Sequence, residues 1–238
     1  MFFVTLDSLF SEWKEHHTFH TFIKDGIVDP AHYESPHILF ILRNMNCQED
    51  FDLRWHLREY GSGWKTWNNI GRWTKALLDH DAEYPADMSQ PARIKEVRRI
   101  AAMNLKKEGG SSRAVGSELL EAVCTQKDYI LKEIELCDPQ IIIACGLSSS
   151  SMMGNASLIH QFIYDGKPQW ETLKSPYWEK EWYYFKASVN GRTVPVVSFC
   201  HPQVTTMAGL RGHQLFELLY KDMQHIRKVF LDGNNDGI

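Results

Sequence analysis

The chain has 238 residues, a length that suits one large α/β domain or two small ones. Hydrophobic residues make up 43% of the chain and charged residues 24%, which is ordinary for a globular protein, and no apolar run is long enough to predict a transmembrane helix. The net charge of −4 argues against a tight nonspecific binder of nucleic acid, because phosphate contacts favour basic proteins. Lysines and arginines nevertheless cluster between Arg93 and Arg113.

The cysteines are scattered, odd in number and contain no Cys-x-x-Cys pair. This usage predicts free, mostly buried thiols in a reducing, cytoplasmic setting. Because no set of spaced ligands accompanies them, we expect no metal site and no cofactor. The N-terminus has neither the basic segment nor the small-residue cleavage site of a signal peptide.

The first half of the chain predicts helices around one buried strand. Asp7 or Ser8 is expected to cap a helix that runs to about Lys24. The short, continuous apolar run His37–Leu42 predicts a buried strand, and the segment Asn46–Gly63 is polar and mixed. Two helices are expected after it, at Asn68–His80 and Pro91–Ile100.

The second half continues the alternation of strands and helices. The expected elements are a short strand at Ala101–Leu105, an amphipathic helix at Ser117–Leu136 stopped by Asp138-Pro139, a buried strand at Ile141–Gly146, strands at Trp182–Ala187 and Thr193–Phe199 with an Asn190-Gly191 turn, and a final helix at Gly212–Phe230. This order predicts a three-layer αβα sandwich around a mostly parallel central sheet. We expect one domain over residues 1–231 and a flexible tail over 232–238.

Polar residues that follow the expected strands are the candidates for function, because open parallel sheets bind ligands beyond the carboxyl ends of their strands. Asn44 follows the first strand, Asn104 lies near the second and His201 follows the last. A carboxamide can orient a water or pair with the edge of a base, and an imidazole can donate a hydrogen bond to developing negative charge. Taken singly, such residues are more often turn, cap or surface residues.

Four short blocks resemble the uracil-DNA glycosylase superfamily in their order along the chain. LFILRNMN resembles the strand and Gly-x-Asn/Asp-Pro loop of its first motif, and AAMNLKK resembles its strand with a base-reading Asn. DPQIIIACG is similar to its Pro-x-Ile-Ile-x-x-x-Gly strand, and SFCHPQ to its His-Pro-Ser motif. TWNNIGRW also looks like the Asn-Ile helix start that follows the first motif.

The resemblance implies roles for individual residues. Asn44 and His201 would be catalytic: Asn44 would position the hydrolytic water, and His201 would hydrogen-bond the base carbonyl as charge builds on the leaving group. Trp64 would stack on the flipped base, with Tyr60 as the alternative. Leu210 or Met207 would wedge into the duplex. The substrate-binding residues expected in this way are Arg43, Trp64, Asn104, Gln203 and Ser148.

The implied activity is that of a monofunctional DNA glycosylase, with DNA as the partner and no membrane. Such an enzyme takes a base out of the stack and hydrolyses its N-glycosidic bond. Leu42 and Met45 replace the Gly and Pro of the first motif, and Gln203 replaces Ser. The expected substrate is therefore a uracil-like or modified base, in DNA repair or antiviral defence.

Two alternatives remain open at this point. The altered first motif and the acidic net charge favour a non-catalytic nucleic-acid or nucleotide-binding module on the same fold. Cys200, next to His201, suggests instead a hydrolase with a thiol nucleophile.

Overall fold

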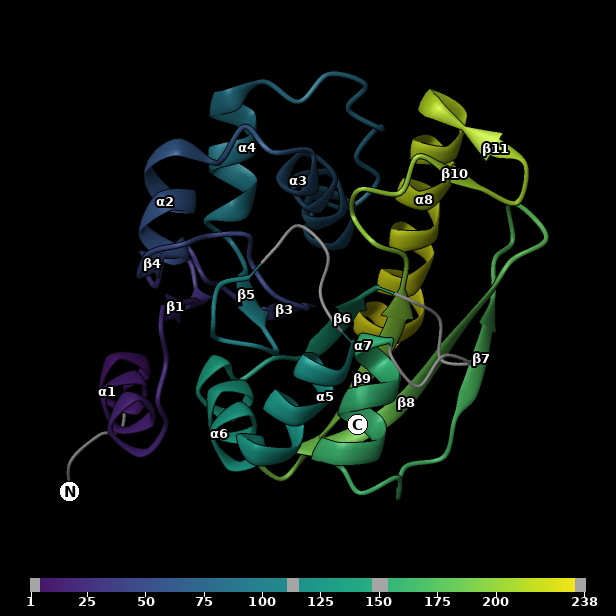
Figure 1. The fold of residues 1–238 in the computed structure, drawn as a ribbon. Coiled ribbons are helices and arrows are strands. Elements are labelled where there is room, and N and C mark those ends of the chain that lie inside the picture. The colour runs from purple at the N-terminus through teal and green to yellow at the C-terminus, as the bar shows by residue number, and fades with distance from the viewer. Residues whose placement is uncertain (1–4, 111–115, 147–153, 234–238) are drawn as a thin grey trace.

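The computed structural model describes residues 5–110, 116–146 and 154–233, which form a mixed α/β fold around a seven-stranded sheet (Figure 1). The strand order is β2-β5-β3-β6-β9-β8-β7. The strands of this sheet are β2 (Gly26–Ile27), β5 (Ala101–Asn104), β3 (Ile38–Leu42), β6 (Ile141–Cys145), β9 (Arg192–Phe199), β8 (Glu181–Val189) and β7 (Glu171–Lys174). Neighbours among β5, β3, β6 and β9 pair in parallel, whereas β2, β8 and β7 add antiparallel margins. The expected α/β class with a mostly parallel sheet is confirmed.

Alternate residues of β3 enter two separate apolar clusters, because successive side chains of a strand point to opposite faces. Phe40 belongs to the cluster that includes residues of α2 (Leu53–Tyr60), α3 (Lys65–Leu78), α4 (Gln90–Val97) and α8 (Gly212–Arg227). Ile41 belongs to the cluster that includes residues of α1 (Leu6–His16), α5 (Gly116–Thr125), α6 (Lys127–Cys137) and α7 (Asn155–Leu158). Figure 1 shows the first group in the upper part of the view and the second in the lower part.

Helix α1 is shorter than the sequence pattern predicts. Thr5 is its N-cap and forms a capping box with Ser8, so neither Asp7 nor Ser8 caps it. The helix ends at His16, because His17 adopts an extended backbone with φ −133°. The chain then enters β1 (Ile23–Lys24), which pairs in parallel with β4 (Phe51–Asp52). The expectation of one helix to Lys24 was therefore wrong, since backbone pairing with a distant segment replaces helical bonds there.

The single helix expected at Ser117–Leu136 is two helices. Gln126, with φ −116° and ψ 17°, separates α5 from α6. Asp138 ends α6 in the left-handed region at φ 45°, which confirms the expected stop at Asp138-Pro139.

The turn between β8 and β9 has the predicted form. Asn190 and Gly191 have φ values of 49° and 75°, the backbone that a two-residue hairpin turn requires. A second hairpin joins β10 (Thr206–Met207) to β11 (Leu210–Arg211). The π-helical segments η1 (Ile159–Ile163) and η2 (Lys228–Asp232) follow α7 and α8 directly. The expected tail starts within η2, and residues 234–238 lie outside the described part of the chain.

No helix among the described residues is both long and apolar enough to span a membrane.

Candidate functional site

The carboxyl ends of the four parallel strands are joined by backbone bonds that continue past the strands. Leu105 N–H donates to Leu42 O at 3.0 Å, and Lys106 N–H donates to Arg43 O at 2.9 Å. Farther along, Gly110 N–H donates to Met45 O at 3.0 Å, so the segment after β5 runs beside the segment after β3. At the other pair of strands, Gly146 N–H donates to Phe199 O at 3.0 Å. The segments that follow these strands therefore lie at one edge of the sheet.

Asn44 is half-buried in the segment after β3. A Cβ atom built at Gly110 would lie 2.9 Å from Asn44 Nδ2, so the glycine leaves room for this carboxamide. An amide in such a place can orient a water, but it cannot accept a proton as a carboxylate can.

His201 follows β9 and has a defined hydrogen bond to its ring. The backbone N–H of Gln203 donates to Nδ1 of His201 at 3.1 Å. Because Nδ1 accepts, the proton of the neutral imidazole is assigned to Nε2, which is then a donor. Part of the side chain is open to solvent. Surrounding protein atoms nevertheless disfavour the charged ring, and the Arg43 guanidinium repels it, so the pKa of His201 lies below its ordinary value.

Arg43 brings the ends of β3 and β9 into electrostatic contact. Its own half-buried position lowers the pKa of the guanidinium, and its charge acts on His201. The structure thus places Arg43, Asn44 and His201 at one edge, with a cation beside a neutral imidazole.

Helix α3 clamps the loop that contains His201. Asn69 is buried, and its Nδ2 donates to Pro202 O at 2.5 Å. Gln203 Nε2 donates to Thr66 Oγ1 at 2.8 Å. The Asn-Ile helix start noted in the sequence therefore lies against the His-Pro loop. Sequence reasoning did not assign Asn69 this role, although its position in that block was a usable signal.

Trp64 is the N-cap residue of α3, two residues before Thr66, which contacts Gln203. Its side chain is 45% exposed, and its ring stacks on His56 with centroids 5.3 Å apart and planes 19° apart. Tyr60, the alternative stacking residue, is 48% exposed and also contacts His56.

Asn104 does not join the residues at the strand ends. It is buried, and both its Nδ2 and its backbone N–H donate to Oδ2 of Asp25, at 2.9 and 2.7 Å. Because its amide nitrogen is engaged in the interior, we assign Asn104 to a buried polar cluster rather than to base recognition.

Fully buried charges form the rest of that cluster. Lys107 Nζ hydrogen-bonds to Asp25 and lies 2.6 Å from Glu133 Oε2, and all three side chains have no exposed area. The Lys107–Glu133 contact has the distance of an ion pair without hydrogen-bond geometry. Burial and the neighbouring Asp25 raise the pKa of Glu133 well above its ordinary value, although Lys107 opposes the shift. The raised pKa favours the protonated form of Glu133 beside the contact between Lys107 and Asp25.

Asn155 is a second buried amide that the sequence did not single out. Its Nδ2 donates to Cys145 O and, at 3.3 Å, to Ile41 O, so it ties the ends of β6 and β3 together. Ser148, one of the expected substrate-binding residues, lies outside the described residues.

Cys200 does not have the properties of a reactive thiol. It is buried, and burial raises its pKa well above the ordinary value, so the thiolate is scarce at neutral pH. Met207 and Leu210, the expected wedge residues, lie half-buried in the β10–β11 hairpin and pack on the core.

Neither the models of known protein families nor the curated proteins include a significant match to this chain.

Proposed function

We propose that this protein is a DNA base glycosylase, built as a three-layer αβα sandwich, that hydrolyses the N-glycosidic bond of a flipped uracil-like or modified base. One observation carries the proposal. The four sequence blocks that resemble uracil-DNA glycosylases overlap β3, β5, β6 and β9, the four neighbouring parallel strands, at or near their carboxyl ends. Arg43, Asn44 and His201 follow two of these strands at the same edge.

His201 has the protonation state that the departing base needs. As the bond from sugar to base breaks, negative charge builds on the base. The Nε2–H of a neutral His201 donates a hydrogen bond to that charge, and the hydrogen bond from Gln203 to Nδ1 keeps the proton on Nε2. A positioned donor of this kind typically contributes about 3–4 kcal/mol to the transition state.

Arg43 and Asn44 supply the remaining chemistry at the edge. The Arg43 guanidinium lies close enough to lower the pKa of His201, so it also attracts an anionic base. The Asn44 carboxamide orients the water that attacks the sugar. Since Asn44 cannot take a proton, we expect the rate to depend mainly on stabilisation of the leaving base. Trp64, half exposed at the rim, stacks on the flipped base.

The substrate base is expected to differ from plain uracil. Asn104, the residue that resembles the family's base reader, donates to Asp25 in the interior. Leu42 and Met45 replace smaller or more rigid residues in the loop that holds Asn44.

A free thiol at every cysteine fits a reducing, cytoplasmic location.

Mass spectrometry of free bases tests the proposal. Purified protein is incubated with DNAs that contain uracil, hypoxanthine or phage-modified bases, and released bases are identified. The wild type is expected to release one of them, and His201→Ala to lower the rate by about a hundredfold or more. His20→Ala, an exposed histidine remote in sequence from the strand-end residues, is the matched control. The proposal fails if every DNA in the panel stays intact.

A non-catalytic DNA-binding module is the second candidate, and the amide at position 44 is the observation that favours it. This reading predicts the same rim contacts with no base release under any condition. Binding that depends on Trp64, in a protein that releases no base, would support it.

A further inference from the structure

A continuous set of aromatic rings, here called the aromatic ledge, extends from the candidate site over α2. Trp64 contacts His56, His56 contacts Tyr60, and Tyr60 contacts Trp55, with centroids 5.3, 5.4 and 5.4 Å apart. Phe51 lies beside His56 at 5.2 Å. The rings come from β4, α2 and the N-cap of α3, so they span a larger surface than one stacked base would cover.

The outer rings of the ledge are open to solvent. Trp55, Tyr60 and Trp64 are 48%, 48% and 45% exposed. Elsewhere in the described chain, the exposed large hydrophobic residues are Tyr177 and Val229. The exposed large hydrophobic side chains of the ledge are all aromatic, a composition that suits planar ring faces better than a lipid surface or an aliphatic protein groove.

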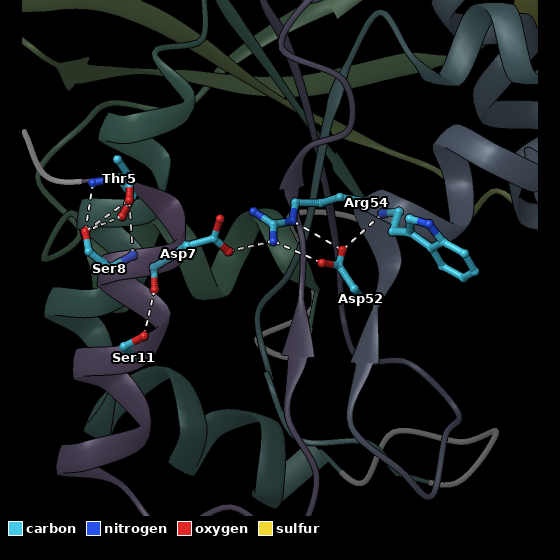
Figure 2. A network of polar contacts seen from close by, with 7 residues as sticks. Thr5, Asp7, Ser8, Ser11, Asp52 and Arg54 are labelled. Atoms are coloured by element: carbon cyan, nitrogen blue, oxygen red, sulfur yellow. Dashed lines mark hydrogen bonds and ion pairs between the residues drawn. The ribbon is translucent and has the colours of Figure 1, made fainter.

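The ledge is held in place from both ends of α2. Figure 2 shows Arg54 between Asp7 of α1 and Asp52, the N-cap residue of α2; Arg54 Nη2 lies 2.8 Å from Asp7 and 3.1 Å from Asp52. At the other end, Gly61 closes α2 in the left-handed region at φ 62°, and its carbonyl accepts from Arg93 Nε at 3.0 Å. Anchoring at both ends fixes the helix that presents the rings, which lowers the ordering cost of binding.

One end of the ledge adjoins the helix that contacts the His201 loop, and the segments that bear the rings also contain cations. Trp64 caps the helix whose Thr66 accepts from Gln203, so one end of the ledge meets the His201 loop. Arg58 lies in α2 beside the ring-bearing residues in sequence and Lys65 follows Trp64; their side chains are partly and fully exposed, and Glu59 pairs with Arg58. Rings that alternate with cations are the pattern that binds single-stranded nucleic acid, because every base offers a face to stack on and every nucleotide a phosphate.

We infer that the aromatic ledge binds the unpaired bases next to the target base, so that the preferred substrate is single-stranded DNA. This inference rests on the proposed function, because it takes the strand that enters the site to continue across α2. The strand passes from Trp64 to Tyr60 and Trp55, and its bases stack on these rings without regard to sequence.

The test measures binding separately from base release. Fluorescence anisotropy gives the Kd for a labelled thymine-only oligonucleotide, single-stranded or in duplex, at one fixed salt concentration. The double variant Trp55→Ala/Tyr60→Ala is expected to bind the single strand roughly tenfold or more weakly. Its affinity for the duplex is expected to stay unchanged, because paired bases present no free faces.

Matched variants isolate the stacking contribution. Tyr177→Ala removes an equally exposed ring outside the ledge and should leave the Kd unchanged. Trp55→Phe/Tyr60→Phe keeps ring faces and should retain single-strand binding. The two single alanine variants, checked by circular dichroism, replace the double variant if it fails to fold.

The outcomes separate this inference from the proposed function. Equal single-strand binding by wild type and the double variant overturns the inference about the ledge. Ledge-dependent binding to phosphatidylglycerol vesicles without binding to the oligonucleotide also overturns it. Base release with ledge-independent binding contradicts the inference alone. Ledge-dependent binding with no base released from any DNA contradicts the glycosylase proposal alone.

Discussion

The backbone N–H of Gln203 and Nδ1 of His201 lie 3.1 Å apart in a hydrogen bond that assigns the imidazole proton to Nε2. Protonation of Nδ1 would break that hydrogen bond. The hydrogen bond, burial and the Arg43 charge therefore all disfavour the charged form of the ring. The residue two positions after the histidine therefore contributes through its backbone rather than its side chain.

Replacement of Arg43 by Met is expected to raise the pKa of His201. The change removes the repulsion between the guanidinium and a protonated ring, whereas burial, the larger cause, remains, so the pKa stays below its ordinary value. In the proposed mechanism the neutral ring is the active form, so the acidic limb of the base-release profile should move to higher pH. A ¹H–¹³C NMR titration of His201 measures the shift, and Arg43→Lys, which keeps the charge, should show little of it.

Substitution of Asn69 by Ala is expected to destabilise the protein by about 1–3 kcal/mol. The variant leaves the Pro202 carbonyl without its donor and the Arg72 side chain without the acceptor that it contacts at 3.0 Å. Thr66→Val, which removes the more exposed bond to Gln203, should cost less than about 1 kcal/mol. Urea unfolding compares the two, and equal small costs would argue against Asn69 as the main clamp of the loop.

Replacement of Lys107 by Met should lower the free energy of unfolding by about 3–5 kcal/mol, because it leaves the buried Asp25 carboxylate without a cation. The adjacent Lys106 pairs with the exposed Glu118, so Lys106→Met should cost less than about 1 kcal/mol. Chemical denaturation of both variants gives the comparison. Similar losses at the two positions would contradict the buried pairing.

The variant Glu133→Gln should gain stability relative to wild type as pH rises. The pKa of Glu133 is raised in the folded state, mainly by burial, so above its ordinary pKa the unfolded chain releases a proton that the folded protein keeps. The free energy of unfolding of the wild type then falls by up to about 1.4 kcal/mol per pH unit, and that of the glutamine variant does not. Urea unfolding from acid to neutral pH measures the difference, and a gap that stays constant with pH would show that Glu133 is ionised in the fold.

Substitution of Gly61 by Ala is expected to cost about 1–3 kcal/mol or more. Its φ of 62° disfavours a side chain, and a Cβ there would lie 2.6 Å from Ile94 Cγ1. Gly63→Ala provides the control, since a Cβ at Gly63 has no neighbour within 4 Å. Thermal melts compare the two variants: a larger drop in Tm for Gly61→Ala than for Gly63→Ala reports the backbone strain and steric conflict at position 61.

Continuous apolar runs predicted the buried parallel strands well. Ile38–Leu42 and Ile141–Cys145 are buried along their whole length, and such runs have few other stable locations. Helix α2 was missed, because the segment that contains it is mixed and polar, and its two buried residues, Leu53 and Leu57, mark only one face. Two-residue strands such as β1 depend on pairing with remote segments, which a local pattern does not contain.

The sequence predicted those site residues whose location is set by their position along a strand. Arg43, Asn44 and His201 follow their strands as expected, and parallel topology brings them to one edge. Asn104 also follows the pattern of its strand, but the direction of its side chain depends on Asp25, far away in the chain. Partners of that kind are set by packing, so the buried cluster around Lys107 was not visible in the sequence.

The two margins of the central sheet bear on how the protein behaves at high concentration. At one margin, β2 has two residues, one of them glycine, and offers little backbone to another strand. At the other, β7 has four residues and presents the charged side chains of Glu171 and Lys174. Short and charged edges discourage strand addition from a second molecule. The long apolar strands at the centre are thereby shielded from edge-to-edge aggregation.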